Sequence, residues 1–226
     1  MLLYETAQKI VENNSDVFYE NKVEVQGYDF RLFTYFLASK KDFDVKYAKE
    51  LRGLCFLRFN DKKRPFLGLH KFFNVNENED TDINILKNKK VKSIQDKSDG
   101  SLISFVMLPD SKILAKSKMS FESDQAKFAQ NYIDNNKNFH DEVYELLMNG
   151  CHPLFEYVAP ENQVVVGYDK AELVLLQIRN KFGEYFEAEN LKEYAEKLNV
   201  NYSEPLDITF EECLELVDTL EDKEGW

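Results

Sequence analysis

Apolar residues recur along this chain at two periods, and their order predicts a mixed α and β fold. Residues 3–13 place apolar side chains three to four positions apart, which is typical of a helix, and the polar run at 13–16 ends it. Residues 18–36 are rich in aromatic and β-branched side chains around Gly27, which predicts a strand, a turn and a second strand. A third strand is predicted over 53–59.

Strands and helices alternate through the rest of the chain, with turn residues such as Pro-Asp-Ser and Asn-Lys-Phe-Gly between them. No internal repeat and no Pro/Gly-rich linker interrupts the pattern, so we expect one α+β domain over 1–226, built on antiparallel sheets flanked by helices. The further predicted strands are 101–108, 113–118, 154–158, 164–168, 173–178 and 184–186, and the further predicted helices are 122–134, 141–148, 189–198 and 210–220.

Composition narrows the class of protein. Of the 226 residues, 43% are apolar, which is enough for a core and speaks against intrinsic disorder. The 29 Lys and Arg against 41 Asp and Glu give a net charge of −12, which excludes a protein coated in basic charge but leaves room for a basic cleft. No stretch approaches the ~20 apolar residues of a membrane span, so we expect a soluble protein without a membrane partner.

Cysteine and histidine spacing gives no sign of a metal site or of a disulfide framework. Cys55, Cys151 and Cys213 are far apart and lack C-x-x-C spacing, so we expect reduced thiols and a cytoplasmic protein, in the host cytoplasm if it is viral. His70 and His152 stand singly and are interpreted as structural or surface residues, as is His140.

The phosphate-binding motifs of P-loop NTPases and Rossmann folds are missing, which leaves Lys97-Ser98-Asp99-Gly100-Ser101 as the best candidate for chemistry. Asp-Gly between two strands is also a common hairpin signal, so an ordinary turn is one interpretation. The other is that Lys97 is a nucleophile, since neighbouring cations or partial burial lower the pKa of an amine.

Several further segments occur in the order found in one superfamily. The chain resembles the covalent nucleotidyltransferases, and within them the ATP-dependent RNA ligases of the T-even phage RNA ligase 1 type. The resemblance runs from about Tyr28 to the last residue. It rests on Ala48-Lys49-Glu50-Leu51-Arg52-Gly53-Leu54-Cys55-Phe56, Arg64-Pro65-Phe66, Lys71-Phe72-Phe73-Asn74-Val75-Asn76-Glu77, Lys97-Ser98-Asp99-Gly100-Ser101-Leu102, Lys116-Ser117-Lys118-Met119-Ser120 with Ser123-Asp124-Gln125, and Phe155-Glu156-Tyr157-Val158-Ala159-Pro160-Glu161-Asn162.

The resemblance implies a role for each matching residue. Lys97 would attack the α-phosphorus of ATP and become lysyl-AMP, with Arg52 and Lys71 at the triphosphate or the departing pyrophosphate. Lys118 would lie near the nucleotide, and Glu156 would accept hydrogen bonds from the ribose hydroxyls. Arg52 and Lys71 as plain surface cations, and Glu156 as a solvated strand residue, remain alternatives. The resemblance also places three further residues of the motif at the nucleotide: Asp99, Gly100 and Ser101.

Two further expectations concern the region that would bind the base. Many relatives place an aromatic ring on the strand over the adenine, where this chain has leucines within 172–178, and no base-contacting residue is assigned. The nearby aromatic residues are expected to belong to the core rather than to contact the cofactor: Phe72, Phe73, Phe155 and Tyr157.

The last residues match only the start of the next family motif. Glu224 is implied as a ligand of Mg²⁺ or Mn²⁺, or else is a frayed terminal carboxylate, and Gly225 and Trp226 follow it. The K-x-K strand and the helical RNA-recognition domain of relatives are absent after Trp226. We therefore expect a truncated chain that binds nucleotide weakly and adenylylates poorly, because charge on the α-phosphate is left partly uncompensated.

We therefore expect the adenylyltransferase domain of an ATP-dependent RNA ligase, a monomer that joins RNA 5′-phosphate and 3′-hydroxyl ends, with RNA or tRNA repair as the implied role. The alternatives are another covalent nucleotidyltransferase, such as a DNA ligase or a capping enzyme, and an inactive nucleotide- or RNA-binding module. The RNA is expected to follow a local basic track while the acidic helices near Glu189 and Glu211 face away. That track, which a solvated surface would also explain, comprises Lys87, Lys89, Lys90, Lys92 and Lys118.

Overall fold

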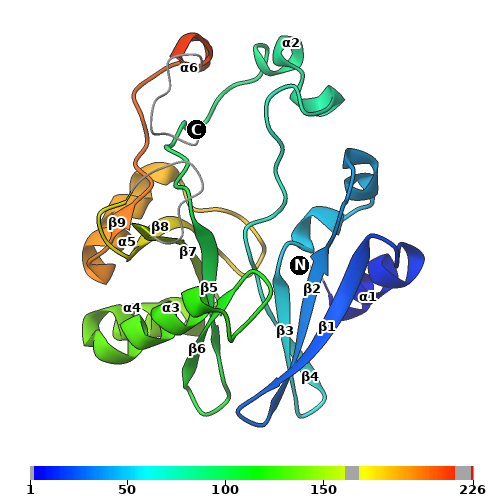
Figure 1. Ribbon diagram of the computed structural model, residues 1–226, viewed down its shortest axis with the longest axis vertical. Helices are drawn as coiled ribbons and strands as arrows, with labels where there is room; N and C mark the ends of the chain where they lie inside the picture. The colour runs from blue at the N-terminus through cyan, green and yellow to red at the C-terminus, as the bar shows by residue number, and fades with distance from the viewer. Residues whose placement is uncertain (1–2, 161–167, 217–224, 226) are drawn as a thin grey trace.

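Two β-sheets form the centre of the molecule in the computed structural model, which describes residues 3–160, 168–216 and 225 (Figure 1). Neighbouring strands are antiparallel except for β8 and β9, which pair in parallel. The four-stranded sheet has the order β1-β2-β3-β4, with β1 (Phe18–Val25), β2 (Tyr28–Tyr35), β3 (Leu54–Phe59) and β4 (Lys62–Phe66). The five-stranded sheet has the order β6-β5-β7-β8-β9, with β5 (Ser101–Met107), β6 (Ile113–Ser117), β7 (His152–Val158), β8 (Glu172–Arg179) and β9 (Asn201–Tyr202).

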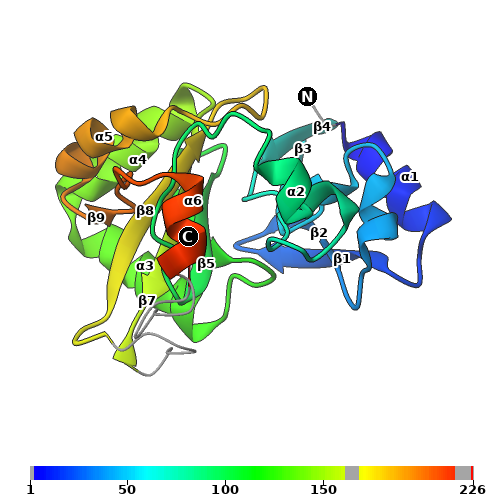
Figure 2. The same ribbon diagram turned by 90° about the horizontal axis from the view of Figure 1, so that it is seen from above.

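Helices cover the outer face of each sheet, so the fold has four layers (Figures 1 and 2). Helix α1 packs on the four-stranded sheet, where the Tyr4 ring meets Phe33 and Phe56 edge-on. Helices α3, α4 and α5 cover the five-stranded sheet. The helices are α1 (Tyr4–Asn13), α2 (Ile83–Leu86), α3 (Asp124–Asn135), α4 (Lys137–Met148), α5 (Leu191–Leu198) and α6 (Phe210–Leu216), with short 3-10 turns at Lys40–Asp44, Ala48–Glu50, Glu79–Thr81 and Ala188–Asn190.

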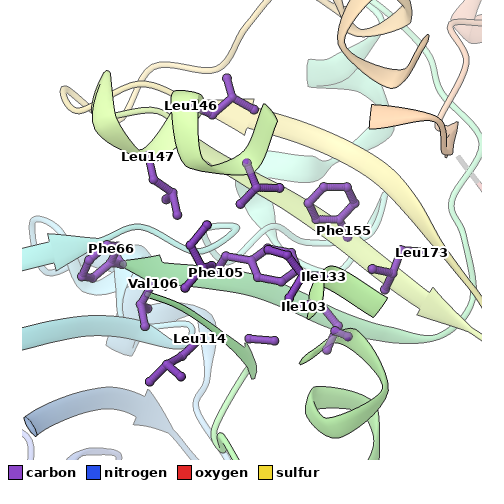
Figure 3. Packing of buried hydrophobic residues seen from close by; sticks show 14 of the residues in the cluster. Phe66, Ile103, Phe105, Val106, Leu114, Ile133, Leu146, Leu147, Phe155 and Leu173 are labelled. Carbon is purple, nitrogen blue, oxygen red and sulfur yellow. The ribbon is translucent and has the colours of Figure 1, made fainter. Parts of the chain in front are cut away.

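One buried cluster joins the inner faces of the two sheets. Phe66 from β4 belongs to the same cluster as Val106 and Leu114 from β5 and β6 (Figure 3). On the helical side of the five-stranded sheet, the Phe105 and Phe155 rings pack against Phe139 of α4. The five-stranded sheet is therefore buried on both faces, which explains the nearly continuous apolar run of β5.

The predicted elements are confirmed with few differences. Helix α1 and strands β1, β2, β3, β5, β6, β7 and β8 lie where the sequence places them. Helix α4 starts at Lys137, earlier than predicted, and 184–186 contributes a single bridge, between Tyr185 and Arg179, instead of a strand. Residues 161–167 and 217–220 lie outside the described part, and with them most of the predicted strand 164–168 and the end of the helix 210–220.

Strand β4 is the main element that the pattern misses. Its residues are mostly charged and include Pro65, which argues against a central strand, but β4 is an edge strand and tolerates a proline. The turn before β4 does have a signal in the sequence, namely the residue types Asn and Asp. Both Asn60 and Asp61 adopt the positive φ that a two-residue hairpin requires, and these residue types tolerate it.

Three basic side chains connect the two halves of the molecule, which we name the first lobe (residues 3–74) and the second lobe (residues 95–160 and 168–205). Arg64 Nη2 donates to the Leu147 carbonyl at 3.0 Å. Lys116 Nζ donates to the Gly53 carbonyl at 3.1 Å. The third is Arg179, which is buried and reaches the first lobe from the end of β8. Because each bond crosses between lobes, these cations help to fix one lobe against the other.

Candidate functional site

A large cleft is lined by residues of both lobes and by Ile83 of α2 and three residues of α6. The two helices lie at the same end of the molecule (Figure 1). The volume of the cleft is about 1390 Å³. Six of the predicted site residues line it: Arg52, Lys97, Gly100, Ser101, Lys118 and Glu156. Sequence segments that are more than a hundred residues apart thus meet in one cavity.

Lys97 lies in the segment just before β5, at the wall of the cleft. Its backbone N–H donates to the Gly225 carbonyl at 2.9 Å. Immediately upstream, the Ser203 hydroxyl donates to the Asp96 carbonyl at 2.7 Å and the Gln95 amide donates to the Ser203 carbonyl at 2.6 Å. The segment that presents Lys97 is therefore held by residues from the carboxyl-terminal third of the chain.

Gly100 is required by close packing of β5 on β7. A Cβ atom at this position would lie 2.1 Å from the Tyr157 carbonyl oxygen and 3.2 Å from Cγ of Glu156. Ser101 pairs with Tyr157, and Leu102 pairs with Glu156. The Asp-Gly pair is thus not a hairpin turn between two strands but the point where the chain enters β5 beside Glu156.

Glu156 projects into the cleft from β7, whereas Phe155 and Tyr157 are buried in the core. The predicted alternation of this strand is therefore confirmed. It lets one strand contribute both a carboxylate that faces the cleft and two rings that pack in the core.

Positive charge is concentrated around Arg52, Lys71 and Lys118, which we name the basic cluster. The pKa of Lys118 is lowered, first by burial and then by the charges of Arg52 and Lys71. The Lys118 ammonium lies 4.9 Å from the centroid of the Tyr35 ring. Burial raises the pKa of Tyr35, and the positive charge of Arg52 opposes that rise. Cations that are held close together repel one another, which raises the free energy of the site when it is empty. Such an arrangement is typical of a site that binds an anion.

Two predicted residues belong to the surroundings of the cleft rather than to its wall. Lys71 lies behind it, with its ammonium 4.4 Å from the Phe73 ring centroid and 3.6 Å from a Glu77 oxygen. Asp99 is buried, and its backbone N–H donates to the Tyr168 hydroxyl at 3.0 Å. Lys71 and Asp99 do not line the cleft, although each is next in sequence to a residue that does.

The prediction that Phe72 belongs to the core is wrong. This ring is 40% exposed and lines the cleft, with the Arg52 guanidinium 5.1 Å from its centroid. It follows directly on Lys71 and alternates with Phe73, which packs on the first-lobe core. Residues 71–74 belong to no strand. Without a regular strand, the sequence does not indicate which side chains of this segment point to the core and which to the cleft.

A β-bulge shapes the wall formed by β8. The pairing with β7 shifts between Leu154 and Phe155, which leaves Leu176 without an opposite residue. As a result Leu176 and its neighbour Gln177 both line the cleft, although adjacent strand residues normally face opposite sides. The leucines expected over the adenine are therefore divided, since Leu173 and Leu175 are in the core.

The acidic helix α6 borders the cleft instead of lying away from it, which corrects the expectation for this segment. Its apolar residues Phe210, Cys213 and Leu214 line the cavity. Its carboxylates Glu211, Glu212 and Glu215 are exposed and are not among the residues that line the cavity. Across the opening, the exposed lysines of 87–92 flank Val91 and Ser93, which also line the cleft.

The three cysteines are free. Within residues 3–160, 168–216 and 225, no group of three or more His, Cys, Asp or Glu side chains is arranged to hold a metal ion, and Glu224 lies outside this part. No helix among the described residues is long and apolar enough to span a bilayer.

Comparison with solved structures supports the fold. Two crystal forms of an archaeal ATP-dependent RNA ligase superpose with TM-scores of 0.64 and 0.63 at 11% sequence identity. They cover 100% and 97% of this chain, which in turn covers 60% and 58% of theirs. At this identity the likeness shows a shared fold, the nucleotidyltransferase fold of antiparallel sheets flanked by helices.

Sequence comparison adds the family. The "Putative RNA ligase" of Thermovibrio ammonificans is 29% identical over 231 residues, covering 98% of this chain. The chain spans only 56% of the length of that relative. A family model described as RNA ligase matches residues 50–226, which include every residue of the predicted site. Since that match extends over most of the 226 residues, this chain belongs to the RNA ligase family.

Proposed function

We propose that this chain is the adenylyltransferase domain of an ATP-dependent RNA ligase, with Lys97 as its nucleophile. The observation on which the proposal depends is that Lys97 and Glu156 line one cleft together with Arg52 and Lys118 of the basic cluster. An amine, a carboxylate and fixed cations in one cavity suit attack on a nucleoside triphosphate.

The first step is transfer of AMP to the protein. The lone pair of Lys97 Nζ forms a P–N bond to the α-phosphorus of ATP, the bond from that phosphorus to the bridging oxygen breaks, pyrophosphate leaves and the amine gives up a proton to solvent. Charge accumulates on the departing pyrophosphate, so cations fixed nearby lower the barrier. Arg52 and Lys71 are the residues we assign to that task, with Lys118 near the α-phosphate.

The basic cluster fits a triphosphate. Arg52 Nη1 is buried and has no hydrogen-bond acceptor among the described residues, although it is at the cleft wall. A buried guanidinium nitrogen without an acceptor is costly, and a phosphate oxygen would satisfy it. Glu156 is assigned to the ribose hydroxyls, and Asp99, Gly100 and Ser101 to shaping the loop beside the nucleotide.

Mg²⁺ or Mn²⁺ is proposed to enter with the triphosphate. The described residues do not form an all-protein metal cage, and Mg²⁺ is commonly held by substrate phosphates with one or two carboxylates. The ion would neutralise phosphate charge when bound. Glu224 is the proposed protein ligand.

The later steps use RNA. AMP passes from Lys97 to an RNA 5′-phosphate, and an RNA 3′-hydroxyl then displaces AMP to form the phosphodiester. We propose that the domain, residues 1–226, acts as a monomer in the cytoplasm in RNA repair, with tRNA as one candidate. Free thiols suit that compartment.

The decisive experiment is the intact mass of the protein before and after incubation with ATP and Mg²⁺. We expect one added AMP in the parent chain and none in Lys97→Ala, with unchanged circular dichroism. An adduct that persists in Lys97→Ala would contradict the assignment of the nucleophile. Lys112→Ala, a change of an exposed lysine away from the cleft, is the matched control and should retain the adduct.

Substrate assays separate the remaining alternatives. ATP against GTP distinguishes a ligase from a capping enzyme, and single-stranded RNA against nicked DNA distinguishes an RNA ligase from a DNA ligase. Reversible nucleotide binding with no adduct at any pH or metal concentration would favour an inactive binding module.

A further inference from the structure

Arg179 is one of the most deeply buried charged side chains among the described residues, and the proposed reaction does not use it. It is the last residue of β8, and its side chain is 2% exposed. The guanidinium donates to both carboxylate oxygens of Glu50, at 2.8 and 2.9 Å. It also donates to the carbonyls of Gly68 at 2.6 Å and Gly183 at 2.8 Å, and lies 4.6 Å from the Tyr185 ring centroid.

The two acceptors in the first lobe belong to the segments that present the basic cluster. Glu50 is two residues before Arg52, and Gly68 is three residues before Lys71. Arg179 thus connects the second lobe, on which Lys97 lies, to the backbone that positions these two cations.

The same two segments are also joined to each other. The Lys71 N–H donates to the Lys49 carbonyl at 2.8 Å. The Arg52 carbonyl oxygen would lie 3.0 Å from a Cβ atom at Gly68, so the segments are in close contact there. A displacement of either segment therefore moves Arg52 and Lys71 together.

Arginine is required for this arrangement. The planar guanidinium donates in several directions at once and matches the two oxygens of a carboxylate, whereas a lysine ammonium is a single point charge. A lysine at this position leaves at least one Glu50 oxygen or the Gly68 carbonyl without its donor inside the protein.

We propose that Arg179 is a positioning residue for Arg52 and Lys71, and through them for the β- and γ-phosphates of ATP. The inference rests on the function proposed above, since it takes the basic cluster as the triphosphate site. Arg179 itself lies beside a separate, smaller pocket of about 360 Å³ with Glu50, His70 and Tyr185, so it is not assigned a contact with substrate.

The test compares the affinities for ATP and AMP by calorimetry, in a Lys97→Ala background that prevents transfer. We expect Arg179→Lys to weaken ATP binding about tenfold and AMP binding less than about twofold, because AMP lacks the phosphates that Arg52 and Lys71 would bind. Glu50→Gln keeps the shape of the partner and should shift the ratio in the same direction by a smaller factor. It also serves as the second variant if Arg179→Lys does not fold.

Two controls separate positioning from general destabilisation. Arg31→Lys alters another buried, ion-paired arginine, whose partners Asp29 and Glu20 lie in the first lobe away from the cleft, and should leave both affinities unchanged. In an Arg52→Ala, Lys71→Ala background, Arg179→Lys should cause no further loss of ATP affinity.

Equal weakening of ATP and AMP binding, a further loss in the double-alanine background, or a parent chain that binds ATP no more tightly than AMP would overturn the proposal. Failure of the proposed function has a different signature, namely no added AMP when Lys97 is intact. The two outcomes are independent because the binding assay requires no covalent step.

Discussion

At the scale of single residues, burial determines how His152 ionises. This side chain is buried at the start of β7, edge-on to the Phe66 ring, and Nδ1 has no hydrogen-bond partner among the described residues. Burial, together with the charges of Arg64 and Arg179, lowers its pKa from 6.5 to about 4. The single-histidine spacing in the sequence is consistent with this structural role.

His152 should make the protein sensitive to acid. Because the pKa of His152 is lower in the folded than in the unfolded state, the unfolded state takes up a proton first as the pH falls. The contribution of neutral His152 to the free energy of unfolding is therefore complete above pH 6.5 and is lost between pH 6.5 and 4. From pH 7 to 4.5 the free energy of unfolding should fall by about 2–3 kcal/mol more in the parent chain than in His152→Phe. Urea unfolding at both pH values measures this, and equal falls would contradict it.

At the scale of elements, the pairing of β5 with β7 brings Lys97 and Glu156 to one cavity. The strands approach so closely at Gly100 that no side chain fits between its Cα and the Tyr157 carbonyl. Lys-x-Asp-Gly in the sequence identifies the segment, but the reason for its glycine is a contact with a strand more than fifty residues later.

Gly100→Ala should therefore destabilise the protein by steric overlap. We expect a loss of at least about 2 kcal/mol in the free energy of unfolding, since backbone must move to admit the methyl group. Gly27→Ala is the matched control: Gly27 has φ +80° but open space around it, so only conformational strain of about 1 kcal/mol applies. Chemical denaturation of both variants tests the order, and a smaller loss for Gly100→Ala would refute the packing argument.

At the scale of the whole molecule, charge is segregated although its sum is −12. The lysines of 87–92 and the carboxylates of α6 are exposed. Helix α6 lies apart from α2, which ends just before Lys87, at the same end of the molecule (Figure 1). A polyanion that approaches from the side of 87–92 therefore meets exposed lysines, which lie close in the chain to the acidic segment 77–82.

Replacing Lys87, Lys89 and Lys90 by glutamine should weaken binding of single-stranded RNA and make it less dependent on salt. Each lost phosphate contact reduces the slope of log affinity against log salt concentration by about 0.7. Lys9, Lys22 and Lys62, which are exposed on α1, β1 and β4, provide a control triple with the same change in net charge. Fluorescence anisotropy at several salt concentrations is the measurement. Equal effects of the two triple variants on RNA affinity would contradict the proposal that these lysines bind RNA.

The sequence by itself determined the periodic elements and the candidate residues. Alternation and helical spacing are local properties, so α1, β5 and the projection of Glu156 opposite to Phe155 follow from neighbouring residues alone. The ordered motifs likewise identified Lys97, Arg52 and Lys118, all of which line the cleft.

Only the tertiary structure decided how these residues meet. The edge position of β4, the bulge at Leu176, the exposure of Phe72 and the Arg179 contact with Glu50 all depend on partners distant in the chain. Hydrogen-bond pairing and packing between two lobes leave no periodic trace in either segment. For that reason six of the residues that line the cleft could be predicted from sequence, whereas Phe72 and the architecture that holds the cleft together could not.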